Sequence, residues 1–189
     1  MKFHFIYFSF FVFYACQNHE YSVGDRAPEF SKMIWLHSPE LQLANLQGKV
    51  VLLRWWTDGC VFCVQSADAL NEWHQRYADS GLVVIGLYHP KPEPRILDPE
   101  EVREFVREKG FQFPIGIDQD WTNLYKFWLG RTPKEFTSVS FLIGKDGKII
   151  YIHPGGEYHK EIAAGHEQCV TSYFEIEMQI QMALRASFH

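Results

Sequence analysis

The chain has 189 residues, of which 47% are hydrophobic and 22% are charged, so its length allows one folded domain with a sizeable core. Its formal net charge is −5 and its basic residues form no cluster, which argues against nucleic-acid binding. No internal repeat divides the chain.

Residues 1–15 form a phenylalanine-rich run with a single cation, Lys2. The run is shorter than the ~20 residues that a membrane span needs, and it predicts a signal peptide over residues 1–16. Ala15 precedes Cys16, which resembles a bacterial lipoprotein cleavage site. We expect a lipid on Cys16, with ordinary secretion or an uncleaved anchor as alternatives. Each alternative places the domain in the bacterial cell envelope, periplasmic or otherwise extracytoplasmic, where disulfides persist and where the anchor is its one membrane contact.

The polar residues 17–26 predict a short tether, and the folded domain is predicted to cover residues 27–189. Near its start, residues 30–36 and 40–46 are separated by a break that contains Pro39. This pattern predicts a small N-terminal β-hairpin.

The segment that organises the domain begins with the apolar run Val50–Trp56, which predicts a buried strand. A turn at residues 57–59 ends the run, and apolar residues then recur at helical spacing to about Asp79. Cys60 and Cys63 therefore lie where a strand passes into the first turn of a helix.

This position predicts redox chemistry for the two cysteines. A helix N-terminus presents unpaired N–H groups and roughly half a positive charge, and both favour a thiolate. Cys60 is the expected attacking sulfur, and Cys63, one turn later on the same side, can close a disulfide with it. Half of a zinc site and an inert disulfide are the alternatives. Zinc needs a second pair of ligands, yet Cys16 and Cys169 are isolated, and so short a loop stabilises little as a cross-link.

Residues 82–88 predict a second buried strand, joined to the first by a parallel, right-handed crossover. The loop that follows, residues 89–95, contains three prolines and should lie at the sheet edge where ligands bind in open α/β folds. It is either a rigid connector or one wall of a substrate groove, with His89 near the thiols.

The remaining elements follow in chain order. Patterns and end signals predict helices over residues 98–109, 121–129 and 168–184, a short extended piece over 111–117, and strands over 136–143 and 149–153 joined by an Asp146-Gly147 turn.

Cys169 begins the last predicted helix and so shares the thiolate-favouring position of Cys60. A lone buried cysteine is favoured over a third redox thiol. His153, His159 and His166 are close in sequence, and a metal site that they form with Cys169 is a minor alternative. No metal ligand is assigned.

The segment from Gly48 to Cys63 resembles the signature of TlpA-like thiol–disulfide oxidoreductases, exported bacterial members of the thioredoxin superfamily, and the likeness extends from about Ala27 to Gly156. It implies an α/β, thioredoxin-like fold: a central mixed sheet flanked by helices, with an N-terminal β-hairpin. It also implies that Cys60 attacks and Cys63 resolves, with a redox-active disulfide and no cofactor. The implied partners are protein thiols or disulfides and an upstream electron donor, and we expect a monomer.

Two positions depart from the family pattern near the thiols. Ser138 stands where the superfamily has a cis-proline that holds the substrate, so Thr137 and Ser138 would have to replace it. We expect the bond before Ser138 to be trans, because a non-proline cis bond costs ~2.5–4 kcal/mol. Arg54 stands where thioredoxins have a buried acid. It either favours the thiolates by charge or is an edge-facing or salt-bridged cation.

Many TlpA-like proteins have a glutamate where this chain has Ser66. A base for Cys63 would then have to be Asp58, Asp68 or water, or none acts.

The sequence therefore predicts an exported thiol–disulfide oxidoreductase, with a reductase favoured over an oxidase or an isomerase. The residues expected to bind substrate or support the thiols are Arg54, Trp56, Thr57, Asp58, His89, Thr137 and Ser138. The first alternative is a peroxiredoxin-like thiol peroxidase, because Thr57 lies three residues before Cys60, although Leu53 replaces the proline of that motif. The second is a Sco-like copper-delivery protein, which would need a histidine that residues 136–143 lack.

Overall fold

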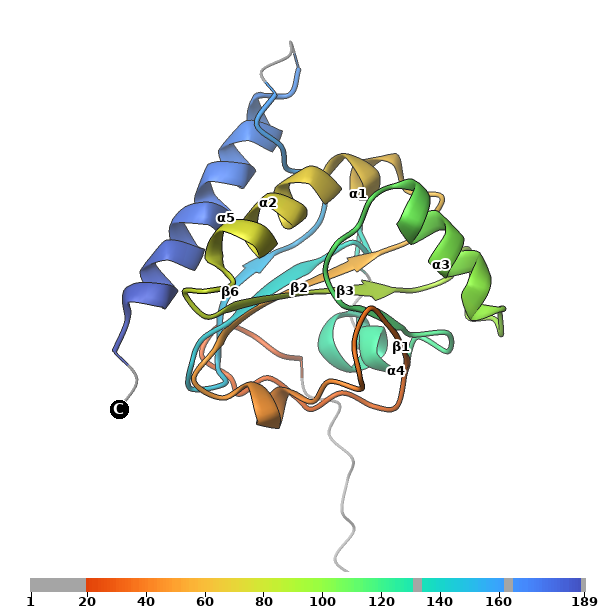
Figure 1. Ribbon diagram of the computed structural model, residues 1–189, viewed down its shortest axis with the longest axis horizontal. Coiled ribbons are helices and arrows are strands. Elements are labelled where there is room, and N and C mark those ends of the chain that lie inside the picture. Colours follow the sequence, from red (N-terminus) through yellow and green to blue (C-terminus); the bar gives the residue numbers. More distant parts are fainter. Residues whose placement is uncertain (1–19, 131–133, 162–164, 188–189) are drawn as a thin grey trace, which may run out of the picture.

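A mixed six-stranded sheet with the strand order β1-β4-β3-β2-β5-β6 runs through the centre of the protein (Figure 1). It is seen in a computed structural model that describes residues 20–130, 134–161 and 165–187. The predicted signal peptide and Cys16 lie outside these residues. None of the described helices is long and apolar enough to cross a membrane.

The strands are β1 (Ile34–Leu36), β2 (Val50–Trp56), β3 (Leu82–Tyr88), β4 (Ile115–Ile117), β5 (Ser140–Ile143) and β6 (Ile149–His153). The helices are α1 (Val61–Gln65), α2 (Ala67–Tyr77), α3 (Pro99–Glu108), α4 (Thr122–Leu124) and α5 (Glu167–Arg185), with a 3₁₀ turn η1 (Leu43–Leu46) and a π-helical turn η2 (Tyr125–Leu129).

The strands β2 and β3 form the middle of the sheet because their apolar, β-branched sequences can be buried on both faces. They run parallel, with Val50 opposite Leu82 and Trp56 opposite Tyr88, and α1 and α2 make the crossover between them. On the other side of β2, the antiparallel strand β5 brings Ser140 opposite Arg54. The predicted mixed sheet flanked by helices is thus confirmed.

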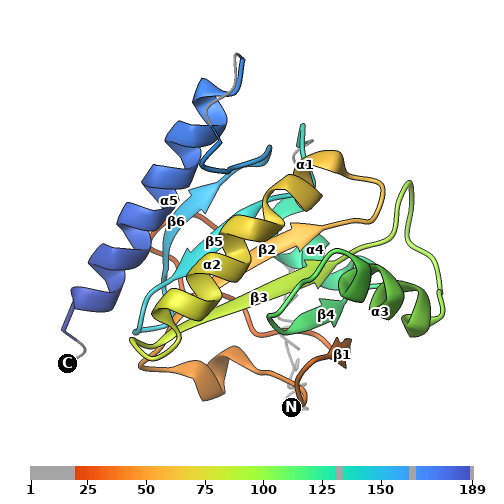
Figure 2. The same ribbon diagram turned by 45° about the horizontal axis from the view of Figure 1, so that its top comes forward.

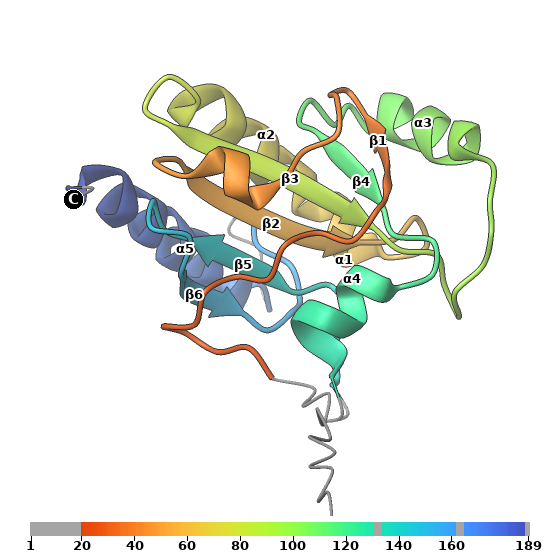
Figure 3. The same cartoon turned by 90° about the horizontal axis from the view of Figure 1, so that it is seen from below.

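Helices cover both faces of the sheet, and each face has its own core (Figures 1 and 3). Helices α1, α2, α3 and α5 cover one face, where Trp73 is stacked between Tyr158 and Tyr173. Figure 2 shows α2 and α5 lying side by side over this face. On the other face, α4 and η2 bring Phe127 against Trp55, with ring centroids 5.1 Å apart. Both faces of β2 are therefore buried, and the end of this strand is held rigidly.

The predicted N-terminal hairpin is wrong. Strand β1 pairs antiparallel with β4 instead of with residues 40–46, and Leu43–Leu46 form the turn η1. The carboxylate of Glu29 explains this turn, because it accepts hydrogen bonds from the N–H groups of Leu43 and Ala44 at 2.7 and 2.8 Å. These N–H groups are therefore not available to a strand partner.

Ordered contacts begin before Ala27, where the tether was predicted to end. The N–H of Gly24 donates to the carbonyl of Ile149 at 2.8 Å, and the backbone of Arg26 forms an isolated antiparallel β-bridge with that of Lys148. The folded domain therefore includes at least residues 24–26.

Three predicted elements have different limits in the structure. The helix that follows the cysteines is divided at Ser66 into α1 and α2. The aromatic helix over residues 121–129 is a short α-helical piece that continues as the π-helical turn η2. The strand predicted over residues 136–143 begins only at Ser140, because the preceding residues are held by side chains of the site.

Gly86, in the middle of β3, leaves no room for a side chain. A Cβ there would lie 2.7 Å from Ile115 Cδ1 and 2.9 Å from Phe113 Cε2. We expect Gly86→Ala to lower the free energy of unfolding by about 1–3 kcal/mol, because the core must shift to accept the methyl group. Urea unfolding of the oxidised protein measures this. Gly59→Ala is the matched control, since nothing lies within 4 Å of a Cβ at that position, and equal losses in the two variants would contradict the explanation.

Candidate active site

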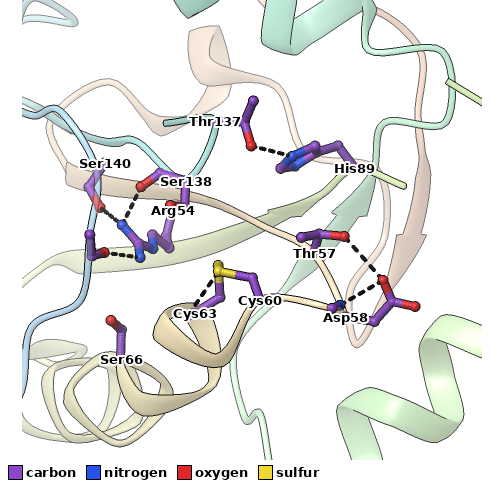
Figure 4. The surroundings of a disulfide bond; sticks show 12 residues. Arg54, Thr57, Asp58, Cys60, Cys63, Ser66, His89, Thr137, Ser138 and Ser140 are labelled. Atoms are coloured by element: carbon purple, nitrogen blue, oxygen red, sulfur yellow. Dashed lines mark hydrogen bonds between the residues drawn. A yellow bond between two sulfur atoms is a disulfide. The ribbon is translucent and has the colours of Figure 1, made fainter. Parts of the chain in front are cut away.

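Cys60 and Cys63 form a disulfide at the point where β2 passes into α1 (Figure 4). Their Cα atoms are 5.3 Å apart, within the range that a disulfide requires. The carbonyl of Cys60 accepts from the N–H groups of Cys63 and Val64, so Cys60 occupies the N-terminal end of the helix, as the sequence predicts. Cys60 is partly exposed and Cys63 is buried. An incoming partner can therefore reach Cys60 first.

The backbone supplies a hydrogen bond to the exposed sulfur. The N–H of Cys63 points to Cys60 Sγ, with a donor–acceptor distance of 3.2 Å. In the reduced protein, the same N–H can donate to a thiolate on Cys60, and hydrogen bonds to the charged form of a group favour that form. The two sulfurs thus differ in exposure and in hydrogen bonding, and attack by Cys60 with resolution by Cys63 stays a prediction.

Arg54 lies beside the disulfide and is completely buried (Figure 4). Its guanidinium donates to the carbonyl of Ser138 at 2.5 Å and to the carbonyl of Gly156 at 2.6 Å, and it lies 4.9 Å from the ring centroid of Tyr158. Burial lowers its pKa, although an arginine remains protonated in proteins. The alternative of an edge-facing or salt-bridged Arg54 is wrong, since within the described residues its partners are carbonyls, a hydroxyl and a ring.

His89 forms a hydrogen bond with Thr137, the residue before Ser138. Its Nε2 is 2.9 Å from Thr137 Oγ1, and its ring packs edge-on against Trp121. The ring points toward Thr137 and not toward the disulfide (Figure 4), and a groove wall formed by the loop after His89 stays a prediction. Burial, with a smaller contribution from Lys91, lowers the pKa of His89 to about 3, which keeps the ring neutral. His89 was expected to begin a loop at the edge of the sheet. Its backbone N–H instead donates to the carbonyl of Trp56, which continues the pairing of β2 with β3 by one residue and leaves the ring buried.

Thr137 and Ser138 are therefore held by two side chains, one from the central strand β2 and one from the residue that follows β3. His89 holds the hydroxyl of Thr137, and Arg54 holds the carbonyl of Ser138. Among the described residues, the Lys91–Pro92 bond is the one cis peptide, so the bond before Ser138 is trans as predicted. Side-chain hydrogen bonds thus order the segment that a cis-proline orders in the family pattern.

The other supporting residues are Trp56, Thr57 and Asp58, at the end of β2 and in the turn that follows it. Trp56 is buried among Tyr88, Phe105 and Phe111, so it supports the core and offers no surface to a partner. Asp58 accepts from the hydroxyl of Thr57 and from the N–H of Gly59, both at 3.1 Å. Asp58 therefore shapes the turn before Cys60.

Asp68 is one of the residues expected to act as a base for Cys63, and Ser66 stands where many TlpA-like proteins have a glutamate. Asp68 is exposed on α2, and Ser66 accepts from the N–H of Tyr158 at 3.1 Å. Neither residue, nor Asp58, has a described hydrogen bond to Cys63. Among the described contacts, Cys63 therefore has no carboxylate base.

Sequence reasoning missed the loop around Gly156 and Tyr158. Its Gly155-Gly156 pair follows a predicted strand and signals a turn, but nothing in the sequence places that turn on Arg54. The thiolate-favouring position inferred for Cys169 is wrong, whereas the favoured interpretation of a lone cysteine without a redox role agrees with its surroundings. Burial and the neighbouring carboxylate of Glu157 raise the pKa of this thiol to about 11, although it lies at the start of α5. Cys169 is therefore poorly suited to be a third redox thiol.

Comparison with known proteins gives the family. The redoxin family model matches residues 22–166. The chain belongs to the redoxin family. It is 30% identical over 153 residues to the thiol-disulfide oxidoreductase ResA of Bacillus thuringiensis (strain Al Hakam), with 79% of each chain covered. It is 32% identical over 133 residues to the protein DipZ of Mycobacterium bovis, which covers 66% of this chain and 18% of DipZ. A thiol-disulfide isomerase from Corynebacterium glutamicum has the same fold, with a TM-score of 0.63, 20% identity, and coverage of 85% of this chain and 98% of that one.

These relatives confirm the TlpA-like, thioredoxin-superfamily prediction and support thiol–disulfide oxidoreductase chemistry at the disulfide. They do not favour the peroxidase alternative. Oxidoreductases of this family use a redox-active disulfide and act without a cofactor.

The buried His89 gives the folded protein a defined pH dependence. The pKa of His89 in the folded protein is below its ordinary value of 6.5, so its stabilising contribution is present above about pH 6.5 and is lost as the pH falls. Between about pH 6.5 and 4.5, we expect a loss of about 1.4 kcal/mol per pH unit from this one group. His89→Gln, which can keep the bond to Thr137, should remove that part of the slope in urea unfolding of the oxidised protein.

The exposed His37 provides the control for this measurement. His37→Asn should keep the slope of the unaltered protein, and the left-handed backbone at this position, with φ of 63°, accepts asparagine. Identical slopes in the His89 variant and the unaltered protein would show that His89 does not stay neutral.

Proposed function

We propose that the protein exchanges disulfides with protein partners through the Cys60–Cys63 pair, working as a reductase. The observation that carries the proposal is the unequal exposure of the two sulfurs at a strand–helix junction. The reduced Cys60 thiolate attacks a partner disulfide and forms a mixed disulfide, and one partner sulfur leaves as a thiolate. The Cys63 thiolate then attacks Cys60 Sγ, and the second partner sulfur leaves. Two electrons pass to the partner, and the enzyme is left with its disulfide.

The proton of Cys63 must leave before the second step. Since no described carboxylate contacts Cys63, we infer that water accepts this proton once the mixed disulfide has formed. Arg54 favours the thiolates by its charge and, through Ser138, orders the backbone that faces them. An upstream donor then returns the disulfide to the dithiol form.

The assignment as a reductase rests on the resemblance to TlpA-like proteins. The positive charge of Arg54 argues against this assignment. A cation that stabilises the reduced, thiolate form raises the reduction potential, and about 30 mV corresponds to 1.4 kcal/mol for this two-electron couple. The potential therefore decides between a reductase and an oxidant or isomerase.

We further propose that the domain is exported and held at the bacterial cell envelope by a lipid on Cys16, acting as a monomer. The apolar run before Cys16 and the Ala15-Cys16 pair support this. The presence of a disulfide also suits an oxidising compartment. The net charge of −5 gives no support to a nucleic-acid partner.

We expect Cys60→Ser to reduce the rate of disulfide reduction to the uncatalysed background, because the attacking thiolate is lost. Cys63→Ser should still attack but should accumulate a mixed disulfide with the substrate at one per chain, since the resolving sulfur is absent. Reduction of a small protein disulfide, followed with mass spectrometry of the trapped species, measures both results. A Cys60→Ser variant that reduces the substrate at the unaltered rate would rule out the mechanism.

A redox titration should show one two-thiol transition for the Cys60–Cys63 pair. For a reductase, the expected potential is near or below about −250 mV, whereas about −120 to −180 mV marks an oxidant or isomerase. Equilibration in graded thiol/disulfide buffers, alkylation and counting of adducts by mass give the potential. The Cys60→Ser, Cys63→Ser double variant is the control and should show no transition. The higher range would overturn the reductase assignment and leave the exchange chemistry in place.

A further inference from the structure

A second cluster of reactive side chains lies between β6 and α5, apart from the disulfide. It consists of Glu157, His159, His166 and Cys169, which each offer one donor atom, and these atoms all lie within 4.8 Å of one another. His159 Nε2 is 3.1 Å from His166 Nδ1, and Cys169 Sγ is 3.2 Å from Glu157 Oε1. Glu157 Oε1 is also 3.2 Å from His166 Nδ1 and 3.9 Å from His159 Nε2. Four donor atoms thus converge on one point.

The spacing of these atoms suits a small tetrahedral cation. Zinc binds cysteine sulfur at about 2.3 Å, histidine nitrogen at about 2.0–2.1 Å and carboxylate oxygen at about 2.0–2.2 Å. Two ligands on a tetrahedron of that size are separated by about 3.3–3.8 Å. Four of the separations are 3.1–3.9 Å and bracket this range, and no two of the donor atoms are more than 4.8 Å apart, so modest movements of the side chains would complete the site.

The burial and the charge of Glu157 also favour a cation at this cluster. The side chain of Glu157 is only 8% exposed, and within the described residues its ion-pair partners are His159 and His166, with no lysine or arginine. Its second oxygen, Oε2, is buried without a hydrogen-bond partner in the described structure. A buried carboxylate without a lasting countercharge is costly. A divalent cation would supply that charge.

We propose that Glu157, His159, His166 and Cys169 bind one Zn²⁺ ion as a closed, four-ligand structural site. On binding, the Cys169 thiol loses its proton to solvent, and the two imidazoles bind as neutral rings. One thiolate, one carboxylate and one Zn²⁺ then sum to zero net charge. A mixed sulfur, nitrogen and oxygen donor set of this kind suits zinc better than magnesium or calcium.

The proposed set differs from the one that the sequence suggests, because Glu157 takes the place of His153. The ring of His153 packs edge-on against Tyr158, and His153 is not part of the cluster. Burial lowers its pKa to about 4.

The site would fasten the loop that holds Arg54. Gly156 accepts from the guanidinium, Tyr158 packs against it, and Glu157 and His159 alternate with these two residues along the chain. A metal ion would join this loop to Cys169 at the start of α5. We therefore expect the ion to stabilise the surroundings of the disulfide without touching either of its sulfurs.

Zinc binding to the full-length, oxidised protein tests the proposal, because oxidation removes Cys60 and Cys63 as competing ligands. We expect one equivalent of Zn²⁺ by calorimetry. Cys169→Ser and His166→Gln should each weaken binding at least ~100-fold, since loss of a mere partner of a ligand already costs about 10–100-fold. His37→Asn and Cys16→Ser should bind as the unaltered protein does. With Co²⁺ as the probe, a thiolate-to-metal charge-transfer band should appear and should be absent from Cys169→Ser.

His166 is 36% exposed, so its substitution leaves the core intact and carries the test even if Cys169→Ser unfolds. Circular dichroism of each metal-free variant shows whether it is folded. Absence of equimolar binding, or binding of equal strength in the folded His166→Gln variant, would overturn the proposal. Neither result bears on disulfide exchange by Cys60 and Cys63, which is measured separately.

Discussion

The arrangement of the site depends on one buried cation. Arg54 lies in the central strand β2, between two cores, and water does not reach it. Removing a guanidinium from water costs several kcal/mol, so its hydrogen bonds to the carbonyls of Ser138 and Gly156 are needed to offset that cost. These bonds bring together two segments that are distant in sequence, the residues before β5 and the loop after β6. The same charge lies beside the disulfide, so one side chain orders the backbone around the sulfurs and, in the proposed mechanism, also favours their ionised form.

The two sulfurs differ because of where the chain places them. Cys60 belongs to the turn that leaves β2, and Cys63 is one turn further along the helix and faces the core. In the proposed mechanism, exposure of the first sulfur permits contact with a partner, while burial of the second delays its reaction until a mixed disulfide exists. The order of steps that we propose therefore follows from the direction in which the chain enters α1.

Local patterns in the sequence predict the parts of the structure that local physics decides. The β-branched run Val50–Trp56 and the turn at residues 57–59 place Cys60 correctly, because burial and turn chemistry act over a few residues. The N-terminal hairpin fails because Glu29, 14 residues before Leu43, captures the N–H groups that a strand would have used. The partners of Arg54 lie 84 and 102 residues away, so no local pattern could name them. The thiolate-favouring position inferred for Cys169 is wrong for a related reason, since burial and the carboxylate of Glu157 together outweigh the helix end at which the thiol lies.

The neutral ring of His89 has a consequence for how this enzyme responds to its surroundings. Because the ring gains no proton until the medium is strongly acidic, its bond to Thr137 is the same in a neutral and in a mildly acidic compartment. Arg54 likewise keeps its charge over that range. The hydrogen bonds that Arg54 and His89 make around the sulfurs are thus kept over that range, although the folded state becomes less stable as the pH falls below about 6.5. A cell envelope whose acidity follows the outside medium would alter the reactivity of the thiols themselves, while the surface offered to a partner would stay unchanged.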